Sequence, residues 1–424
     1  MTPAPVSRRD FLATSATAVV GLSIGVSFGA CGGGPRRPDA TAAFAPDAWI
    51  RIDTEGLVTV LIDRAEMGQG ISTGLAMLVA EELDARWDAM RVAFAPAHPD
   101  YANPLLRGMQ ATGGSTSMRA AWGPLREAAA KARVMLVQAA ATEWDVPEHE
   151  CHTDAGRVVH PISGRSRSYG ELAVAAGTGR APQRVTLKQP DQFRLIGQSL
   201  PRVDSPDVVR GAPIYTSDLR LPGMYTAVIA RPPSIGATLT HVDDAAARQV
   251  PGVQQVVTVP SGVAVVADGY WAAEQGRRAL RLSWSEGTAP TLNDDAIDAT
   301  LREALDAPGL AIIQREGTPD AAHATAAQQI DAEYAVPYLA HATMEPMVCV
   351  ADVRDDACTV WAPTQLQWGP SYAGGGAIGT AADRADVPVS RVTIHSMQMG
   401  GGFGRRSELD FIAEAVEVSK AVGA

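Results

Sequence analysis

The 424-residue sequence predicts a multidomain α+β protein, and three observations lead to this fold class. At ~100–200 residues per domain, the chain is long enough for two to four domains with a large core. Apolar residues make up 46% and charged residues 20%, which is typical of a packed globular protein rather than a disordered or multi-span membrane protein. Strand-like and helix-like segments follow one another with glycine-rich turns between them. The net charge of −11 argues against nucleic acid as a partner.

Residues 1–31 are expected to be a twin-arginine export signal. Arg8 and Arg9 directly precede residues 13–30, an uncharged stretch of apolar and small residues. A short membrane anchor is the alternative, although 18 residues interrupted by Ser, Thr and Gly are marginal for spanning ~30 Å of hydrocarbon. Cys31 follows a rough lipoprotein cleavage site. We therefore expect a periplasmic protein, either free or lipid-anchored at Cys31.

Residues 45–180 are expected to form the first folded segment. A buried strand at 57–62 runs into Glu-Met-Gly-Gln-Gly at 66–70, and a helix with one apolar face follows. A polar loop at 113–118 precedes a longer helix that reaches Trp144. Residues 151–160 read as a β-hairpin that turns at Asp-Ala-Gly. Strand geometry would point His149 and His152 to opposite faces, so we reject a metal site there.

Residues 200–285 alternate strands and helices and predict a compact α/β module. A candidate linker at 177–190 precedes it, and a polar segment at 285–329 follows it. Residues 325–424 are expected to open the next domain, with strands that include 330–336 and a helix from 407 to the terminus. We expect that helix to expose an apolar stripe through Ile412 and Val416.

Glycine-rich turns carry the chemistry that the sequence suggests. Residues 400–406, Gly-Gly-Gly-Phe-Gly-Arg-Arg, follow a strand and open a helix, so their backbone N–H groups can converge on an anion or an oxo ligand. A Gly-x-Gly-x-x-Gly match at 374–379 lacks a preceding hydrophobic strand and predicts a small-residue helix or loop. The cysteines show no Cys-x-x-Cys spacing, so an iron–sulfur or zinc site is not expected. Cys349 and Cys358 are either a disulfide or two buried thiols.

The order of these motifs resembles the molybdopterin-binding large subunit of the xanthine oxidase family. Within the family, the isoquinoline 1-oxidoreductase beta-subunit branch, which includes bacterial aldehyde dehydrogenase large subunits, is the most similar. The strongest elements of the resemblance are 66–70, the stretch Arg-Gly-Ala-Pro-Ile-Tyr-Thr-Ser-Asp at 210–218, and 400–406. On this resemblance, residues 200–285 are similar to the family's hammerhead-shaped domain, and 325–424 to the first part of the main cofactor domain.

The resemblance implies a molybdenum hydroxylase that uses molybdopterin cytosine dinucleotide with Mo, on a small-molecule substrate such as an N-heterocycle or aldehyde. In the family, the glutamine of Gly-Gln-Gly lies near the metal, the Phe-Gly backbone faces it, and no protein side chain ligates it. The remaining loop residues would hold the pterin or its phosphates. Glu345 is either a structural carboxylate or part of the cofactor pocket. The cofactor-binding residues expected here are Gly68, Gln69, Gly70, Gly113, Gly114, Ser115, Thr116, Gly401, Gly402, Phe403, Gly404, Arg405 and Arg406.

Family members carry a C-terminal half whose Gly-Val-Gly-Glu segment provides the general base, a group that contributes roughly 10²–10⁴-fold to rate. The sequence contains no such segment, so we expect the C-terminal half to be missing and no catalytic residue to be present in this chain. A split gene, with that half as a separate chain, or a truncation would explain it. Expected partners are a small [2Fe-2S] subunit and a cytochrome c subunit. The alternatives are a non-catalytic exported binding or assembly module, and a flavin or nicotinamide dehydrogenase.

Overall fold

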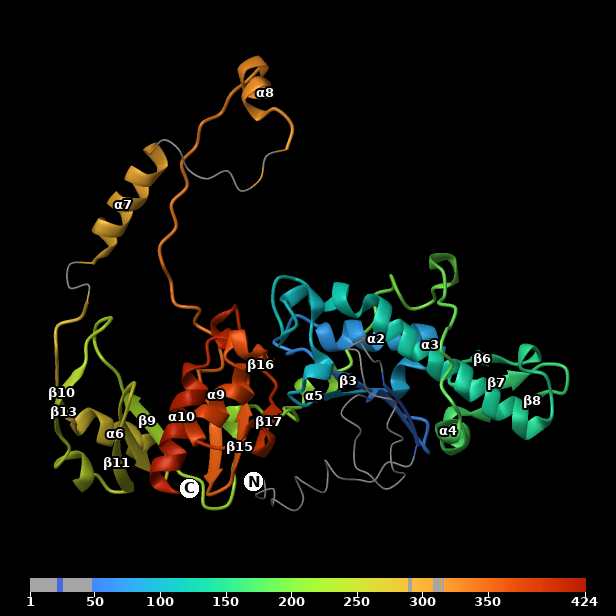
Figure 1. Cartoon of the computed structure of the whole chain (residues 1–424), viewed down its shortest axis with the longest axis horizontal. Helices are drawn as coiled ribbons and strands as arrows, with labels where there is room; N and C mark the ends of the chain where they lie inside the picture. The colour runs from blue at the N-terminus through green and yellow to red at the C-terminus, as the bar shows by residue number, and fades with distance from the viewer. Residues whose placement is uncertain (1–20, 26–47, 289–291, 308–313, 315) are drawn as a thin grey trace. The chain divides into compact units, whose positions relative to one another are not determined.

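The computed structural model describes residues 21–25, 48–288, 292–307, 314 and 316–424. The chain divides into two compact units (Figure 1): Met1–Tyr225 together with His341–Ala424, and Thr226–Ala340. The twin-arginine motif and Cys31 lie outside the described residues. Residues 200–225, which we expected in the central module, belong to the first unit.

The first unit begins with a four-stranded sheet in the order β1-β2-β3-β4. Strand β1 (Gly21–Gly25) lies within the predicted export signal and pairs antiparallel with β2 (Ala48–Asp53). Strand β3 (Val58–Ile62) pairs antiparallel with β2 and parallel with β4 (Met90–Phe94). The predicted strand at 57–62 and the hairpin-free crossover after it are confirmed, because a helix must connect two parallel neighbours.

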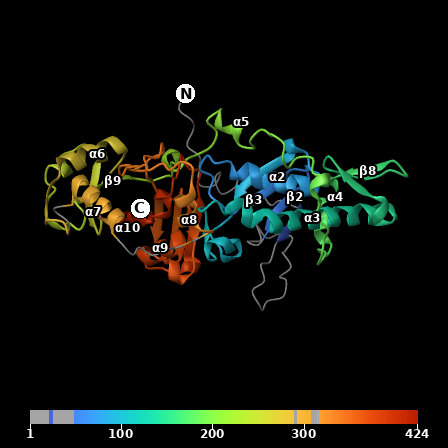
Figure 2. The ribbon, with the colours of Figure 1, turned by 90° about the horizontal axis from the view of Figure 1, so that it is seen from above.

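That crossover is α2 (Ile71–Leu83), which packs against the long helix α3 (Ser117–Trp144). Figures 1 and 2 both show the two helices side by side. Together with the sheet they enclose the larger apolar core, in which Leu75, Val79 and Leu136 are fully buried. Both helices were predicted from their apolar periodicity, and α3 ends at Trp144 as expected.

A three-stranded antiparallel sheet follows α3. It consists of β6 (His152–Asp154), β7 (Arg157–His160) and β8 (Arg165–Ser168), with α4 (Tyr169–Thr178) after it. Ala155 and Gly156 have positive φ angles of 45° and 77° and form the predicted hairpin turn. Ser168 and Glu171 form a capping box that starts α4.

The C-terminal part of the first unit has a core of its own. Strands β14 (Val350–Arg354), β15 (Ala357–Ala362) and β17 (Val392–Ser396) form one sheet, and α9 (Gly376–Ala385) and α10 (Asp410–Val422) pack on it. The short strands β5 (Gln110–Ala111) and β16 (Leu366–Trp368) pair antiparallel and join this part to the N-terminal part. As predicted, the Gly-x-Gly-x-x-Gly match at 374–379 forms a tight turn and the start of α9.

The expectation of an exposed apolar stripe on the last helix is wrong. Ile412 and Val416 are both 0% exposed. They belong to the second core, which α9, β14 and β15 complete around α10. The Oγ atom of Ser419, on the same helix, accepts a 2.9 Å hydrogen bond from the N–H of Val353 in β14.

The second unit contains a three-stranded antiparallel sheet, β11-β12-β9, and a two-stranded sheet, β10-β13, with a helix between the last two strands. Its elements are β9 (Thr226–Ala230), β10 (Leu239–Asp243), β11 (Val253–Val259), β12 (Gly262–Ala267), α6 (Tyr270–Ala279), β13 (Arg281–Trp284), α7 (Asp294–Asp306) and α8 (Pro319–Thr325). The α/β character predicted for this region is confirmed.

Two element predictions in the second unit are wrong. Residues 243–249 form the end of β10 and a single 3-10 turn at Ala247–Gln249 instead of a helix. Residues 330–336 have no regular structure and are exposed, with Tyr334 89% exposed. Their alternating apolar pattern gives them the preference of a strand, but no described element pairs with them, and pairing is what makes a strand.

Cys151, Cys349 and Cys358 are free thiols, so the disulfide alternative for the last two is wrong. The strand register explains this result: Cys358 lies opposite Val353, and Trp361 lies opposite Val350, which places Cys349 several positions further along the sheet. In the described part of the chain, no helix is both long and apolar enough to cross a bilayer.

Candidate cofactor site

Three loops that are far apart in the sequence meet in the first unit. We call them the motif loop (66–70), the polar loop (113–116) and the glycine loop (400–406). The N–H of Ala65 donates to Oγ1 of Thr112 at 2.8 Å, which joins the bases of the first two loops. The N–H of Met399 donates to the carbonyl of Glu66 at 3.2 Å, which joins the first and the third. The structure therefore brings together all three motifs that the sequence singled out.

Gln365 is the residue that ties the polar loop to the glycine loop. Its side-chain Nε2 donates to the carbonyl of Thr112 at 3.0 Å, and its Oε1 accepts from the N–H of Gly404 at 3.1 Å. Its backbone N–H donates to the carbonyl of Arg406 at 2.9 Å, and its carbonyl accepts from Thr112 at 2.8 Å. Sequence analysis missed Gln365, because a glutamine after a strand carries no local signal of contacts this distant.

The glycine loop needs its glycines at two positions for different reasons. A Cβ atom at Gly402 would lie 2.7 Å from Oε1 of Gln365 and 2.8 Å from Sδ of Met67, closer than any real contact. Gly404 has a φ of 99°, where residues with a side chain are strained. Phe403 itself has a φ of 54°, and its side chain is 70% exposed. The loop is thus a strained, closely packed turn that presents an aromatic ring outward.

Arg406 holds the glycine loop from inside. Its guanidinium is 0% exposed and donates to the carbonyls of Gly401 and Glu345, both at 2.7 Å, and to the Glu345 carboxylate at 3.1 Å. That carboxylate also accepts from the N–H of Gly400 at 3.0 Å. Burial lowers the pKa of Arg406 and raises that of Glu345, and the attraction between the two groups opposes both shifts. These contacts favour the structural-carboxylate interpretation of Glu345.

Arg405 also has a protein partner. Its guanidinium forms a two-pronged ion pair with Asp410 at the start of α10, at 2.9 and 2.6 Å. The hydrogen bond to Asp410 raises the pKa of Arg405. Both arginines that we expected at the pterin or its phosphates therefore stabilise the protein in this structure, and Arg405 alone keeps exposed surface.

The motif loop is organised by a carboxylate that sequence analysis did not select. One oxygen of Glu66 accepts from the N–H groups of Gly68 at 2.9 Å and Gly70 at 3.0 Å, and the other accepts from Ser72 at 2.9 Å. The signal for it was an acidic residue just before a helix, where a negative charge satisfies free N–H groups. Gln69 is exposed and folds back on its own loop: Oε1 accepts from Met67 at 2.7 Å, and Nε2 donates to Ala65 at 2.8 Å.

The polar loop lies at the beginning of α3. Gly113, Gly114 and Ser115 are exposed, and the latter two have positive φ angles of 58° and 51°. Thr116 is buried, and its Oγ1 donates to the carbonyl of Gly113 at 2.8 Å while accepting from Asn103 at 2.9 Å. Consecutive left-handed residues before a 28-residue helix expose N–H groups at its positive end, which suits an anionic group such as phosphate.

These residues fit a large, phosphate-bearing cofactor. Each loop has one glycine, Gly68, Gly113 or Gly404, at which an added Cβ atom would meet nothing within 4 Å, so the backbone there is open to close approach by a ligand. Around them the loops are fixed by buried hydrogen bonds rather than by a ligand. Among the described residues, no group of three or more His, Cys, Asp or Glu could hold a metal ion by itself.

Comparisons with known proteins agree with this geometry. Two family models, both described as a molybdopterin cofactor-binding domain, match residues 7–208 and 306–423. Isoquinoline 1-oxidoreductase subunit beta of Brevundimonas diminuta is 32% identical over 467 residues, covering 99% of this chain and 58% of the relative. A membrane-bound aldehyde dehydrogenase [pyrroloquinoline-quinone] of Gluconacetobacter polyoxogenes is 31% identical over 450 residues, covering 99% and 55%.

Among solved structures, the chain is similar to quinoline 2-oxidoreductase from Pseudomonas putida 86, with a TM-score of 0.39, 20% identity and coverage of 54% of this chain and 33% of that one. The chain spans about half the length of the curated relatives it matches, 58% and 55% of the two named above. The two matched cofactor-binding domains contain all three loops. The chain belongs to the molybdopterin-binding subunits of the xanthine oxidase family.

Proposed function

We propose that the chain is the N-terminal portion of a molybdenum hydroxylase large subunit that oxidises an N-heterocycle or an aldehyde with water-derived oxygen. The observation that carries the proposal is the meeting of the motif, polar and glycine loops around Thr112 and Gln365. The named substrates of the curated relatives, isoquinoline and aldehydes, support the substrate classes. The relatives' greater length means that further parts of such a subunit act with this one.

The residues described here would bind and orient the cofactor. We assign the exposed backbone of Gly113, Gly114 and Ser115, at the positive end of α3, to the phosphates, and the backbone at Phe403 and Gly404 to the metal end. When bound, molybdopterin supplies the molybdenum centre at which a substrate carbon is hydroxylated. We further propose the cytosine dinucleotide form, in which the second phosphate and nucleotide extend the anionic surface that the polar loop would hold.

Gln69 would face the metal end once the cofactor is bound. Its amide now has both of its polar atoms on the backbone of its own loop, at 2.7 and 2.8 Å. This arrangement fixes the rotamer of Gln69 before any ligand arrives and leaves the outer face of the amide exposed. Such preorganisation lowers the cost of ordering the side chain on binding.

Electrons would leave through a small [2Fe-2S] subunit and then a cytochrome c. The four cysteines of the sequence have no spacing for a cluster, so the carrier must be on another chain. We also propose export through the twin-arginine route to the periplasm, which the Arg8-Arg9 motif and the uncharged stretch after it support.

The test is Gly402→Val, measured in the complex purified from the native host. A side chain at Gly402 would push Gln365 and Met67 apart, and these residues hold the three loops together. We expect the variant complex to lose more than about nine-tenths of its molybdenum, because a loop displaced by even ~1 Å no longer matches a rigid ligand. Metal analysis by mass spectrometry is the measurement.

The control is Gly123→Val, on α3, where an added Cβ atom meets nothing within 4 Å. This variant should keep its molybdenum. Normal molybdenum in Gly402→Val would contradict the assignment of the site. A native complex that contains no molybdenum at all would favour the alternative, a non-catalytic binding or assembly module that retains the fold.

A further inference from the structure

One segment of the first unit, residues 186–204, has long-range contacts that the cofactor loops do not explain. We call it the strap. It contains the 3-10 turn Pro190–Gln192 but otherwise has no regular structure. Its first residues lie at the C-terminal end of α2, and its last residues lie at the N-terminal end of the same helix, where the motif loop begins. Part of it was expected to be a linker, yet it is held by buried charges.

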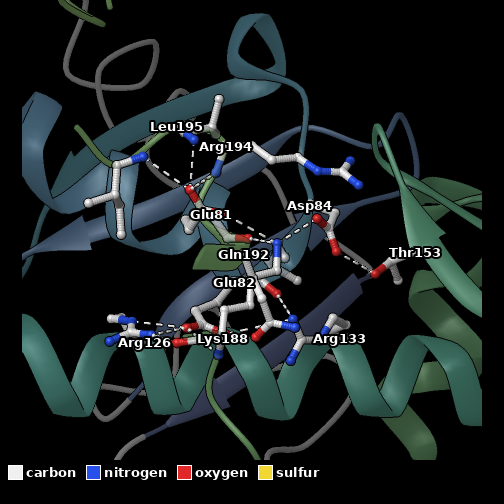
Figure 3. Close-up of polar contacts among 12 residues, drawn as sticks. Glu81, Glu82, Asp84, Arg126, Arg133, Thr153, Lys188, Gln192, Arg194 and Leu195 are labelled. Atoms are coloured by element: carbon white, nitrogen blue, oxygen red, sulfur yellow. Dashed lines mark hydrogen bonds and ion pairs between the residues drawn. The ribbon is translucent and has the colours of Figure 1, made fainter. Parts of the chain in front are cut away.

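The clasp at the C-terminal end of α2 is built on Glu81 (Figure 3). One oxygen of this carboxylate accepts three consecutive backbone N–H groups of the strap, from Arg194 at 2.9 Å, Leu195 at 2.7 Å and Ile196 at 3.0 Å. The other oxygen lies 3.3 Å from Nζ of Lys188. Burial favours the neutral acid, but the three N–H bonds and Lys188 hold the pKa of Glu81 below its usual range.

Glu82 extends the clasp from α2 to α3 (Figure 3). Its carboxylate is 0% exposed and pairs with the guanidinium of Arg126 at 2.7 Å, while the N–H of Lys188 approaches both of its oxygens at 3.2 and 3.3 Å. Arg126 also donates to the carbonyl of Lys188 at 2.6 Å. Hydrogen bonds to buried charges are stronger than neutral ones, so this end of the strap is firmly fixed.

The other end of the strap delivers Arg202 to the motif loop. Its guanidinium donates to the carbonyl of Gly68 at 2.8 Å and to the carboxylate of Glu66 at 3.3 Å. Asp204 holds the same guanidinium from the strap side with two hydrogen bonds, at 2.8 and 2.6 Å. The bond to Asp204 raises the pKa of Arg202. A fork of this kind fixes direction as well as distance, which a lysine cannot reproduce.

Glu66 makes Arg202 important for more than its own contacts. The carboxylate of Glu66 accepts the N–H groups of Gly68, Gly70 and Ser72, so it sets the shape of the loop that carries Gln69. Without Arg202, this carboxylate, 1% exposed, would have no cation to compensate its burial. The loop would then lose its outer support at the carbonyl of Gly68.

We propose that Arg202 is a positioning residue for Gln69, and that the clasp at Glu81 sets the place of Arg202 through the strap. The inference rests on the proposed function only in the role of Gln69. The coupling itself is a property of this chain: contacts at one end of α2 determine the geometry of the loop at its other end.

Hydrogen exchange of backbone amides in the full chain tests the coupling without any cofactor. Arg202→Met should speed exchange of the amides of Gly68, Gly70 and Ser72 by about tenfold or more and leave residues 194–196 unchanged. Glu81→Gln should speed exchange at 194–196 and also at 68–72. Arg202→Lys keeps the charge without the fork and should fall between the parent and Arg202→Met. Arg210→Met is the control, since Arg210 is exposed and pairs only locally with Asp207.

Unchanged exchange at 68–72 in Arg202→Met would overturn the role of Arg202. Faster exchange confined to 194–196 in Glu81→Gln would overturn the coupling through the strap. If Arg202→Met does not fold, Arg202→Lys is measured at the same amides, and exchange equal to the parent there would count against the proposal.

A readout on the loaded native complex separates positioning from simple stabilisation. Arg202→Met should keep its molybdenum but lower kcat by about tenfold with little change in KM, and Arg202→Lys should recover part of kcat. Normal kcat with faster exchange would assign Arg202 a purely structural role and overturn the positioning proposal. Loss of molybdenum in Gly402→Val concerns the proposed function alone, so the two ideas fail separately.

Discussion

Buried charges at the glycine loop are stable only as a pair. Glu345→Ala would leave the guanidinium of Arg406, 0% exposed, without its carboxylate partner. Removing one member of a buried ion pair costs about 3–5 kcal/mol, so we expect a loss of that size in the free energy of unfolding by urea. Asp410→Ala removes the half-exposed partner of Arg405 and should cost about 0–1 kcal/mol. Equal losses in the two variants would contradict the structural role of Glu345.

A second buried pair predicts a dependence of stability on pH. Burial raises the pKa of Asp63 from 3.8 to about 6, and the charge of Arg64 beside it opposes this shift. The folded state therefore keeps a proton that the unfolded chain releases above its own pKa. The contribution of Asp63 to stability is present below pH ~4 and is lost as the pH rises toward ~6. Urea unfolding across this range should show a decrease that Asp63→Asn lacks. A parallel decrease in the variant would assign the effect to other groups.

At the scale of elements, α10 (Asp410–Val422) shows what burial by later packing means. Ile412 is 0% exposed inside the second core, so Ile412→Ala should cost about 2–5 kcal/mol of unfolding free energy. Val389→Ala, at a side chain 49% exposed, is the control and should change stability by less than about 0.5 kcal/mol. A loss below ~1 kcal/mol in Ile412→Ala would mean that the helix packs less tightly than described.

Elements whose partners are local in sequence were predictable, and those with distant partners were not. The periodicity of α2 and α3 and the turn residues of the β6–β7 hairpin contain their own structural signal. Residues 330–336 carry a strand pattern without a described partner, and α10 has a partner, β14, that lies about sixty residues earlier. Periodicity reports which face of an element is apolar, but it does not report what covers that face.

At the scale of the whole molecule, the order of the motifs predicted which loops would meet. It could not predict what joins them, because Gln365, Glu66 and Arg202 act through contacts between residues more than forty positions apart or with backbone groups that no motif records. The same limit applies to the strap. A linker and a clasped segment have similar compositions, and only the buried carboxylates Glu81 and Glu82 distinguish them.

Export is the prediction that concerns the chain as a whole. The signal depends on the guanidinium groups of Arg8 and Arg9, so replacing both by Lys keeps the charge and removes the feature that the export machinery recognises. We expect the variant to stay in the cytoplasm. The sequence offers a matched control in Arg36 and Arg37, a second arginine pair with no uncharged stretch after it, and replacing this pair by Lys should leave delivery unchanged. Cell fractionation followed by immunoblotting measures both. Periplasmic delivery of the first variant at the parent level would show that residues 1–31 act by another route, and retention of both variants would show that charge placement, not the twin-arginine motif, controls export.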